Sequence, residues 1–244
     1  MMIIYGLNPV LEALRAGRVR GLRVSRRSDQ RMQEVLQLAS RARVPVQQVE
    51  AGDLDRAARG GPHQGVVAEV EQAPDHSVAE LVAGARTAPL VVVLDGVEDP
   101  HNFGAILRVA DAAGVDGVVR QTRHAAAIDG VAAKASAGAL AHVRMASVVN
   151  IARAIDELKA ANVWTVGLAG DAPQRYSELD LTLPTALVLG AEGTGLRRLV
   201  RERCDLLASL PMRGHVESLN VSVAAGIVLF EAVRQREAAH REGR

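Results

Sequence analysis

Two patterns of hydrophobic and polar residues divide the chain. Up to about residue 70, short apolar stretches are separated by polar ones, as in a small α/β unit. From residue 90 onward, apolar runs are continuous and alternate with helical patterns. Continuous runs are typical of strands buried on both faces, which indicates a parallel sheet flanked by helices.

The elements of the first part are predicted as helices over 9–16 and 31–41 and strands over 21–25, 44–49 and 66–70. The candidate strands of the second part span 90–94, 117–119, 143–145, 163–168, 186–189 and 206–210. Between the two parts, turn-forming residues surround only a short helical pattern, as in a linker. We therefore predict an α/β fold with a small unit at 1–72, a linker at 73–88 and a larger unit at 89–244.

Composition excludes several classes of function. Lys and Arg number 29 against 28 Asp and Glu, so the protein does not hold nucleic acid by bulk charge alone. Two Phe, two Tyr and one Trp are too few for the stacking platforms of single-strand binders. Cys204 is the only cysteine, which excludes intrachain disulfides and multi-thiolate metal sites. The histidines have no metal-binding spacing, and we expect no metal.

The expected location is the cytoplasm. The first residues lack the charged and apolar regions of a signal peptide. No apolar run approaches the roughly 20 residues that span a bilayer. A single cysteine also fits a reducing compartment, so we expect no membrane partner.

Arginine is concentrated near the start of the chain. Only one acid, Asp29, lies among these arginines, which occupy positions 15, 18, 20, 23, 26, 27 and 31. The cluster is either a solvated face or a contact for RNA phosphates, and the sequence leaves both interpretations open.

Three segments follow predicted strands, where ligands bind in an open parallel sheet. The first segment, residues 94–108, is a polar loop that enters a helix carrying Gly104, Arg108 and Asp111 on one face. Taken alone, Arg108 could simply pair with Asp111 three residues later. The second segment, residues 189–196, contains G-x-x-G-x-G, which is neither a dinucleotide fingerprint nor a P-loop. It could equally be a tight structural turn.

The third segment, residues 210–224, is a polar loop before a helix predicted to end near Arg236. Ser218 or Asn220 could cap this helix, but capping explains only one of the polar residues Ser218, Asn220 and Ser222. Covalent catalysis has no support, because no G-x-S-x-G surrounds Ser218 and Cys204 lies in a charged segment at a helix end, typical of a structural thiol.

In this order and at these strand ends, the three segments resemble the motifs of the SpoU (TrmH-like) family of RNA ribose 2'-O-methyltransferases, within the SPOUT superfamily. The motif residues are Asn102, Gly104 and Arg108, then Gly190-Ala191-Glu192-Gly193-x-Gly195, then Ser218-Leu219-Asn220-Val221-Ser222. Residues 5–10 and 63–66 are similar to the start and end of the family's N-terminal RNA-binding domain, which has a ribosomal-protein-like fold. Residues 95–102 most resemble the bacterial branch that methylates a guanosine in 23S rRNA.

The resemblance implies a methyltransferase unit whose C-terminal part forms a deep trefoil knot that binds S-adenosylmethionine. It also implies a homodimer with active sites at its interface. The cofactor-binding residues that it implies are Gly190, Leu210, Leu219, Leu189 and Met212. The catalytic residues that it implies are Arg108, Asn102, Glu192, Ser218 and Asn220.

The resemblance assigns Arg108 to the ribose hydroxyl. A guanidinium with a pKa above about 12 is a poor base. We therefore hypothesise that Arg108 stabilises the developing alkoxide, while the phosphate of the target nucleotide or water accepts the proton. The other four catalytic candidates would orient groups through hydrogen bonds.

Alternative functions differ in class. The expected substrate is 23S rRNA or a large-subunit precursor, and tRNA or another rRNA nucleotide is the main alternative. A non-catalytic assembly factor would not need the intact set Asn102, Arg108, Glu192 and Asn220. A nicotinamide oxidoreductase would need the missing dinucleotide fingerprint.

Overall fold

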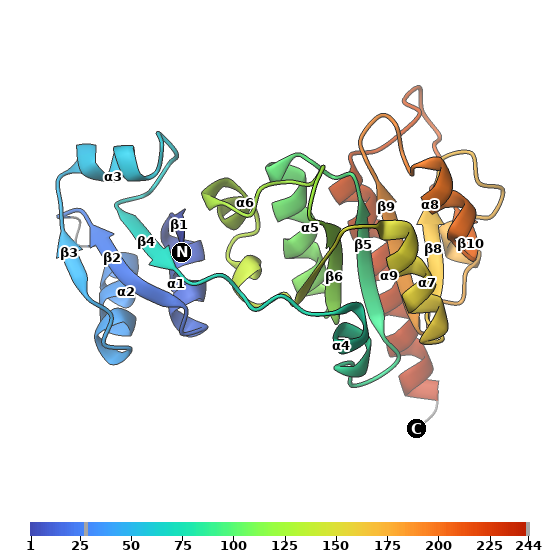
Figure 1. Cartoon of the computed structure of the whole chain (residues 1–244), viewed down its shortest axis with the longest axis horizontal. Coiled ribbons are helices and arrows are strands. Elements are labelled where there is room, and N and C mark those ends of the chain that lie inside the picture. Colours follow the sequence, from blue (N-terminus) through green and yellow to red (C-terminus); the bar gives the residue numbers. More distant parts are fainter. Residues whose placement is uncertain (27–28, 243–244) are drawn as a thin grey trace.

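The computed structural model describes residues 1–26 and 29–242 and contains two sheets. Figure 1 shows a small sheet at one end of the long axis and a larger sheet at the other, connected by an extended segment. Arg27, one of the clustered arginines, lies outside the described residues.

The first sheet has the strand order β1-β4-β2-β3. β2 and β3 run parallel, whereas β4 is antiparallel to both β1 and β2. The strands are β1 (Met2–Tyr5), β2 (Val19–Val24), β3 (Val46–Gln48) and β4 (Val66–Val70). The helices of this unit are α1 (Leu7–Arg15), α2 (Gln30–Arg41) and α3 (Ala51–Ala57).

The second sheet has the order β10-β8-β9-β5-β6-β7, and every neighbouring pair is parallel. The predicted parallel sheet is therefore confirmed. Its strands are β5 (Leu90–Asp95), β6 (Gly117–Gln121), β7 (Met145–Val148), β8 (Trp164–Leu168), β9 (Thr185–Gly190) and β10 (Leu206–Ala208).

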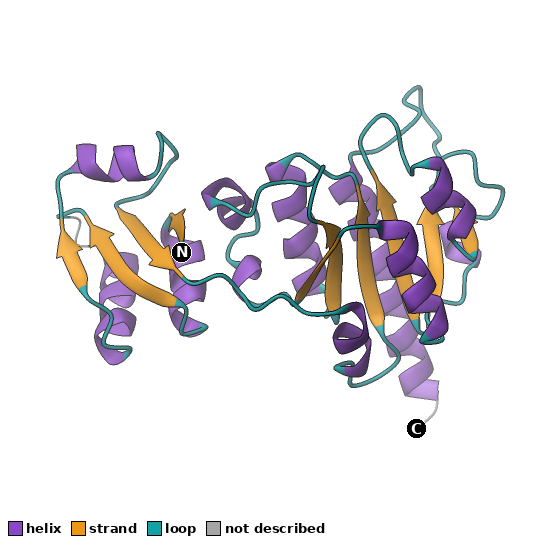
Figure 2. Ribbon diagram, in the orientation of Figure 1, coloured by secondary structure: helices purple, strands orange, loops and turns teal. Residues whose placement is uncertain are grey.

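Helices cover both faces of the second sheet, as Figure 2 shows. Val92 of β5 packs in a core with α5 and α9, whereas Val91 and Val93 pack with α4, α7 and α8. This two-sided burial explains why the strands are continuously apolar. The elements are α4 (Val78–Ala83), α5 (Pro100–Ala112), α6 (Gly130–Ala135), α7 (Ile151–Ala160), α8 (Arg198–Arg203), α9 (Val221–Glu242) and the short 3-10 helices η1 (Ala139–Ala141) and η2 (Tyr176–Glu178).

Several elements differ from the sequence prediction. β1 was not predicted, and neither was α3, in which Leu54 is the one buried residue and no apolar period arises. The short helical pattern in the linker does form a helix, α4, which begins with a capping box of Ser77 and Glu80. β7 lies two to three residues later than predicted.

Helix α9 continues past the predicted end near Arg236 as far as Glu242, the last described residue. Its last turns carry the i,i+3 pair of Arg234 with Glu231 and the i,i+4 pair of Arg241 with Glu237. Such pairs favour the helical conformation in a region with little apolar pattern. Gln235 also donates to the Leu179 carbonyl at 3.1 Å, which fastens the β8–β9 connection to α9. This is the part of the chain to which the resemblance assigns the trefoil knot.

The two units pack directly against each other. A continuous hydrophobic core runs from Ile4 in β1 to Leu140 in η1 and on to Val92 in β5. Gly130 is required at this joint, because a Cβ there would lie 2.4 Å from Cε1 of Tyr5. His142 Nε2 also lies 2.9 Å from Oε2 of Glu12 across the joint. The first unit is therefore seated on α6 and η1 of the second.

Candidate functional site

The three motif segments meet at one side chain, the amide of Asn220. Its Nδ2 donates to Oδ1 of Asn102 at 2.8 Å and to Oε1 of Glu192 at 2.9 Å. Each partner follows a different strand, since Asn102 comes after β5 and Glu192 after β9. Carboxyl ends of parallel strands share one edge of a sheet, and this places the segments together although Asn102 and Asn220 are 118 residues apart.

Asn220 is also the cap of α9. Its Oδ1 accepts from the backbone N–H of Ser222 at 2.9 Å and of Val223 at 3.4 Å. One amide therefore uses its oxygen to begin the helix and its nitrogen to join the motifs. The capping interpretation of Asn220 is confirmed, and its role as a site residue stays a prediction.

A buried carboxylate that sequence reasoning missed supports the same edge. Asp95 ends β5 with no exposed surface, and it accepts from the backbone N–H of Arg197 at 2.8 Å and from Arg197 Nε at 2.6 Å. The contact pins the end of the second segment to the start of the first. An acid that ends a wholly apolar strand was the signal available in the sequence.

The glycines of the second segment form a tight turn. Ala191 and Gly195 exchange backbone hydrogen bonds of 3.1 and 2.9 Å, and Gly195 has φ of 67°. A Cβ at Gly190 would lie 2.2 Å from the carbonyl carbon of Gly195, so no larger residue fits. The structural-turn interpretation is therefore confirmed for the loop itself.

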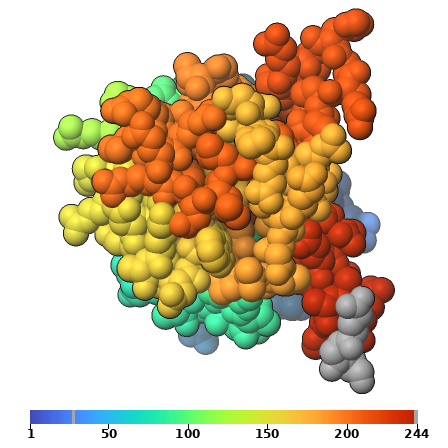
Figure 3. Space-filling view, turned by 90° about the vertical axis from the view of Figure 1, so that its right-hand side faces the viewer, coloured from blue at the N-terminus to red at the C-terminus, as the bar shows by residue number. Residues whose placement is uncertain are grey.

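A cavity of about 560 Å³ opens beside this turn, at the carboxyl ends of β8, β9 and β10. The five predicted cofactor residues all line it: Leu189, Gly190, Leu210, Met212 and Leu219. Ser218, Asn220 and Glu192 line it as well. Figure 3 shows the segment after β10 projecting at the top of this end of the molecule.

The cavity fits the proposed cofactor. Its volume lies within the range of about 300–1,000 Å³ found for small-molecule sites. Leucine and methionine side chains suit an adenine ring, and Gly190 has no side chain to fill the space beside it. Asn102 is buried and does not line the cavity, and its contact with the cavity wall is the hydrogen bond to Asn220.

Arg108 is not brought to this cavity. It lies on the exposed side of α5 and is absent from the cavity lining. Within the described chain its guanidinium has no hydrogen bond or ion pair, so the suggested pair with Asp111 does not form. Arg108 is therefore a free cation on the surface of one chain.

Gly104 has a packing role. A Cβ there would lie 2.5 Å from Cβ of Ala135 and 2.7 Å from the carbonyl oxygen of Ala132. The glycine of the first motif therefore allows α5 to pack closely on α6.

Sequence reasoning also missed Arg120, a charged residue that is buried, with only 7% of its surface exposed. Its guanidinium lies 5.0 Å from the ring centroid of Phe103, the neighbour of Asn102. Nη2 donates to the Ala126 carbonyl at 2.6 Å, and Nη1 has no partner among the described residues. Burial lowers the pKa of this guanidinium. Arg120 thus packs against α5 and holds the loop after β6, in which the Ala126 N–H donates to the Val97 carbonyl at 2.9 Å.

Cys204 is a structural thiol, as expected. Burial raises the pKa of its thiol to about 12, and Sγ donates to the Val200 carbonyl at 3.3 Å. Within residues 1–26 and 29–242, no group of three or more His, Cys, Asp or Glu side chains is arranged to hold a metal ion. None of the helices in these ranges combines the length and apolarity needed to cross a membrane.

Most of the clustered arginines are ion-paired. Arg15 pairs with Glu34 at 2.7 Å, Arg20 with Glu71 at 2.6 Å and Arg23 with Glu69 at 2.9 Å. Glutamates distant in the sequence therefore neutralise much of the local positive charge.

Comparison with known proteins gives consistent matches. Residues 89–230 match the SpoU rRNA Methylase family, and residues 3–75 match a family described as RNA 2'-O ribose methyltransferase substrate binding. The chain is 45% identical over 240 residues to the 23S rRNA (guanosine-2'-O-)-methyltransferase RlmB of Pseudomonas putida, covering 96% of each chain. It is 48% identical over 211 residues to RlmB of Ralstonia nicotianae, covering 86% of this chain and 85% of that one.

Solved structures agree with these matches. The SpoU methyltransferase AviRb from Streptomyces viridochromogenes, in complex with the cofactor AdoMet, aligns with a TM-score of 0.82 and 30% identity. The alignment covers 97% of this chain and 90% of AviRb. The TrmH/SpoU tRNA modifying enzyme of A. aeolicus aligns with a TM-score of 0.58 and 33% identity, over 68% of this chain and 86% of that one.

Proposed function

The chain belongs to the SpoU rRNA methylase family, and from this membership we propose that it methylates the ribose 2'-hydroxyl of a guanosine in 23S rRNA, using S-adenosylmethionine. The observation that carries the proposal is the convergence of Asn102, Glu192 and Asn220 beside a cofactor-sized cavity. The RlmB relatives, similar over nearly the whole chain, support the choice of nucleotide and RNA. Such a substrate implies action in the cytoplasm.

The cofactor would lie against Leu189, Leu210 and Leu219, with the turn at Gly190 beside it. When bound, S-adenosylmethionine supplies a methyl group already activated by its sulfonium. The remaining task is to align the ribose hydroxyl with that methyl carbon and to assist loss of its proton.

The residues joined by Asn220 would provide alignment. Their hydrogen bonds exist before substrate binds, so little reorganisation is needed during the reaction. In the described chain, Glu192 uses Oε1 for Asn220, which leaves its second oxygen for a ligand. Ser218 lines the cavity and offers a hydroxyl to the substrate.

Arg108 would act on the hydroxyl from a second copy of the chain. It does not line the cavity of its own chain, and it lies on α5, which packs beside an exposed apolar stripe of α9. In that stripe Val223 and Phe230 are each 49% exposed, and Ile227 lies between them at helical spacing. Exposed apolar stripes mark protein interfaces. We propose a homodimer through α5 and α9, with Arg108 stabilising the developing alkoxide across it.

A methyl-transfer assay tests the reaction. Labelled S-adenosylmethionine is incubated with total RNA lacking the modification, which is then separated into large rRNA and tRNA. We expect label in 23S rRNA as 2'-O-methylguanosine. Label in tRNA would keep the reaction but change the substrate. No label in either fraction, with RNA binding intact, would support the assembly-factor alternative.

Mixing two inactive variants tests the dimer. Arg108→Ala and Asn220→Ala homodimers each lack one half of every site. If Arg108 acts across the interface, mixed dimers rebuild one complete site each, and random exchange restores about a quarter of wild-type activity. No recovery in a verified mixed dimer would place Arg108 in the site of its own chain. Phe230→Glu, analysed by light scattering, should yield monomers.

A further inference from the structure

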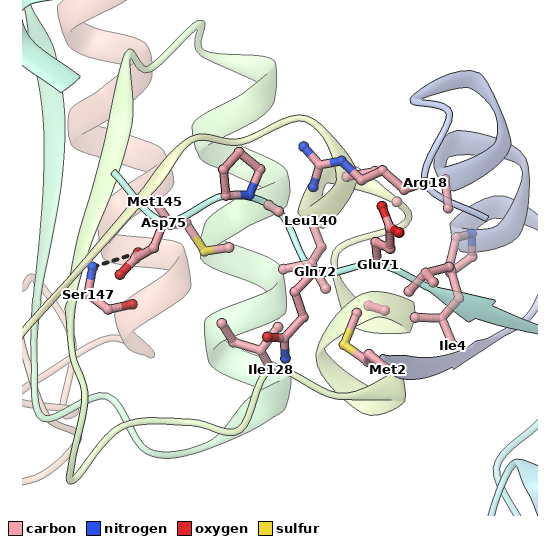
Figure 4. Close-up of a pocket in the computed structure, with 18 residues that line it drawn as sticks. Met2, Ile4, Arg18, Glu71, Gln72, Asp75, Ile128, Leu140, Met145 and Ser147 are labelled. Carbon is pink, nitrogen blue, oxygen red and sulfur yellow. Dashed lines mark hydrogen bonds between the residues drawn. The ribbon is translucent and has the colours of Figure 1, made fainter. Parts of the chain in front are cut away.

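A second cavity lies at the joint between the two units and is separate from the cofactor cavity. It has a volume of about 210 Å³ and is lined by β1, α1, the linker, α6, η1 and β7. Figure 4 shows Met2 and Ile4 from the first unit facing Ile128, Leu140 and Met145 from the second. We call this cavity the joint pocket. Its volume is below the range of about 300–1,000 Å³ for typical small-molecule sites, so it has room for one ring system.

Arg18 is the cation at the rim of the joint pocket. It is half-buried, and its guanidinium has no hydrogen-bond or ion-pair partner within the described residues. This distinguishes Arg18 from Arg15, Arg20 and Arg23, which are all paired with glutamates. Burial lowers the pKa of Arg18, yet a guanidinium stays charged at neutral pH. A partly desolvated, unpaired cation is suited to an anionic ligand.

The acids of the joint pocket are already engaged. Glu71 pairs with Arg20 at 2.6 Å, and Asp75 accepts the backbone N–H of Ser147 at 2.9 Å. Gln72, two residues after the end of β4, adds an amide that can donate and accept. The pocket therefore combines apolar walls, two carboxylates that already have partners, the Gln72 amide and one guanidinium without a partner among the described residues.

We propose that the joint pocket binds one unstacked base of the substrate RNA, with a neighbouring phosphate on Arg18. This inference rests on the proposed function and adds to it a second RNA contact, outside the methylation site. Bases of single-stranded RNA are commonly splayed out and held by stacking and by hydrogen bonds to their edges. The protein has few aromatic residues, and here the thioethers of Met2 and Met145 with the aliphatic walls provide the surface for the ring.

The location favours RNA over a free metabolite. The pocket is shared between the unit that matches an RNA methyltransferase substrate-binding family and the unit that matches the methylase family. A strand that contacts both units passes their joint. A base held there would fix the position of the strand, and thereby help to select the nucleotide that reaches the cofactor cavity.

Methyl NMR of methionine gives a direct test in the full-length protein. Met2 and Met145 line the joint pocket, Met212 lines the cofactor cavity, and Met32 is fully buried in the first unit. The probe is a 23S rRNA fragment that the enzyme methylates. We expect this fragment to shift the Met2 and Met145 signals and leave Met32 unchanged, while S-adenosylhomocysteine alone shifts Met212. Tight RNA binding without a change at Met2 and Met145 would overturn the proposal.

Two variants test the pocket by affinity. Arg18→Gln removes the cation, and Ala141→Phe fills the cavity from η1. We expect each to weaken rRNA binding about tenfold, and Arg18→Gln to reduce the salt dependence by about one phosphate contact. KM for RNA should rise while kcat at saturation is retained. The control Arg41→Gln removes an equal charge from an exposed site on α2 that does not line the pocket.

The outcomes separate this proposal from the proposed function. If the wild-type protein methylates rRNA but both pocket variants bind RNA as tightly as Arg41→Gln, the joint pocket is not an RNA site. If the wild-type protein methylates no RNA at all, the proposed function fails first. Unchanged circular dichroism and S-adenosylmethionine affinity show that each variant is folded.

Discussion

The polar side chains at the cofactor cavity and on the outer surface of α5 differ in their hydrogen bonding. At the cavity, Asn102, Asn220 and Glu192 are joined by hydrogen bonds within one chain. On α5, Arg108 is exposed and unpaired within the described residues. The side chains of a hydrogen-bonded network are positioned before a ligand binds. An unpaired arginine side chain becomes positioned only when it contacts a ligand or another chain. On the proposed function, one chain would hold the methyl donor by itself, whereas its Arg108 would act on the acceptor bound to a second copy.

The largest expected effect is that of replacing Arg108, the unpaired side of this comparison. We expect Arg108→Ala to lower kcat by about 10³, because one electrostatic contact to the developing alkoxide is lost. S-adenosylmethionine affinity should be unchanged, since Arg108 does not line the cavity. Calorimetry and single-turnover methyl transfer measure the two effects. Arg108→Lys should recover only part of the rate, and a rate near that of wild type would contradict a role for the guanidinium fork.

Replacement of Asn220 tests the hydrogen-bonded network, and its expected effect is smaller. Asn220→Ala removes the cap of α9 and both hydrogen bonds to the motifs, and we expect a loss of about 1–2 kcal/mol in the free energy of unfolding. Asn220→Ser keeps a capping oxygen but removes the amide donor, and it adds no charge beside Glu192. It should therefore retain more stability than Asn220→Ala in urea unfolding and still lose methyl transfer by tenfold or more. Equal activity in Asn220→Ser and wild type would restrict Asn220 to the cap.

The smallest expected effect concerns Cys204, at the end of α8. Its thiol pKa is about 12 in the folded protein and about 8.5 in an unfolded chain. The folded thiol stays neutral at pH 8, and iodoacetamide should modify it far more slowly than in urea. Above pH 8.5 the unfolded state loses this proton first, so stability should fall slightly as the pH rises. Mass spectrometry measures the alkylation, and rapid modification of the folded protein would contradict the burial.

The strands of the large sheet were predictable because burial on both faces leaves a local signal. β5 is buried at every position, and its apolar run is visible without knowledge of its neighbours. By contrast, β3 is exposed at all three residues and lies at the edge of its sheet, so its bounds were only approximate. Elements with one buried residue, such as α3, give no period to detect.

Motif resemblance identified residues that line the cavity, but it did not identify the hydrogen bonds that hold them. The five cofactor residues were assigned by motif resemblance, and the cavity contains all of them. The contact between Asp95 and Arg197 crosses 102 residues, and no local pattern reports such a pairing. The same holds for the joint pocket, whose walls come from both units. Long-range contacts depend on the register and order of strands, which hydrophobic periodicity does not determine.

The distance along the chain between the partners of Asn220 has a consequence for folding. The side chain of Asn102 is hydrogen-bonded to Asn220, which lies 118 positions later in the chain. Contacts of such separation carry a large loop-closure cost and form late, so folding of this unit should be slow compared with that of a local helical bundle. The cavity is therefore among the last features to appear, and a ligand that recognises it binds only chains that have nearly finished folding. S-adenosylmethionine would then act as a stabiliser of the completed fold, in proportion to its concentration over its Kd.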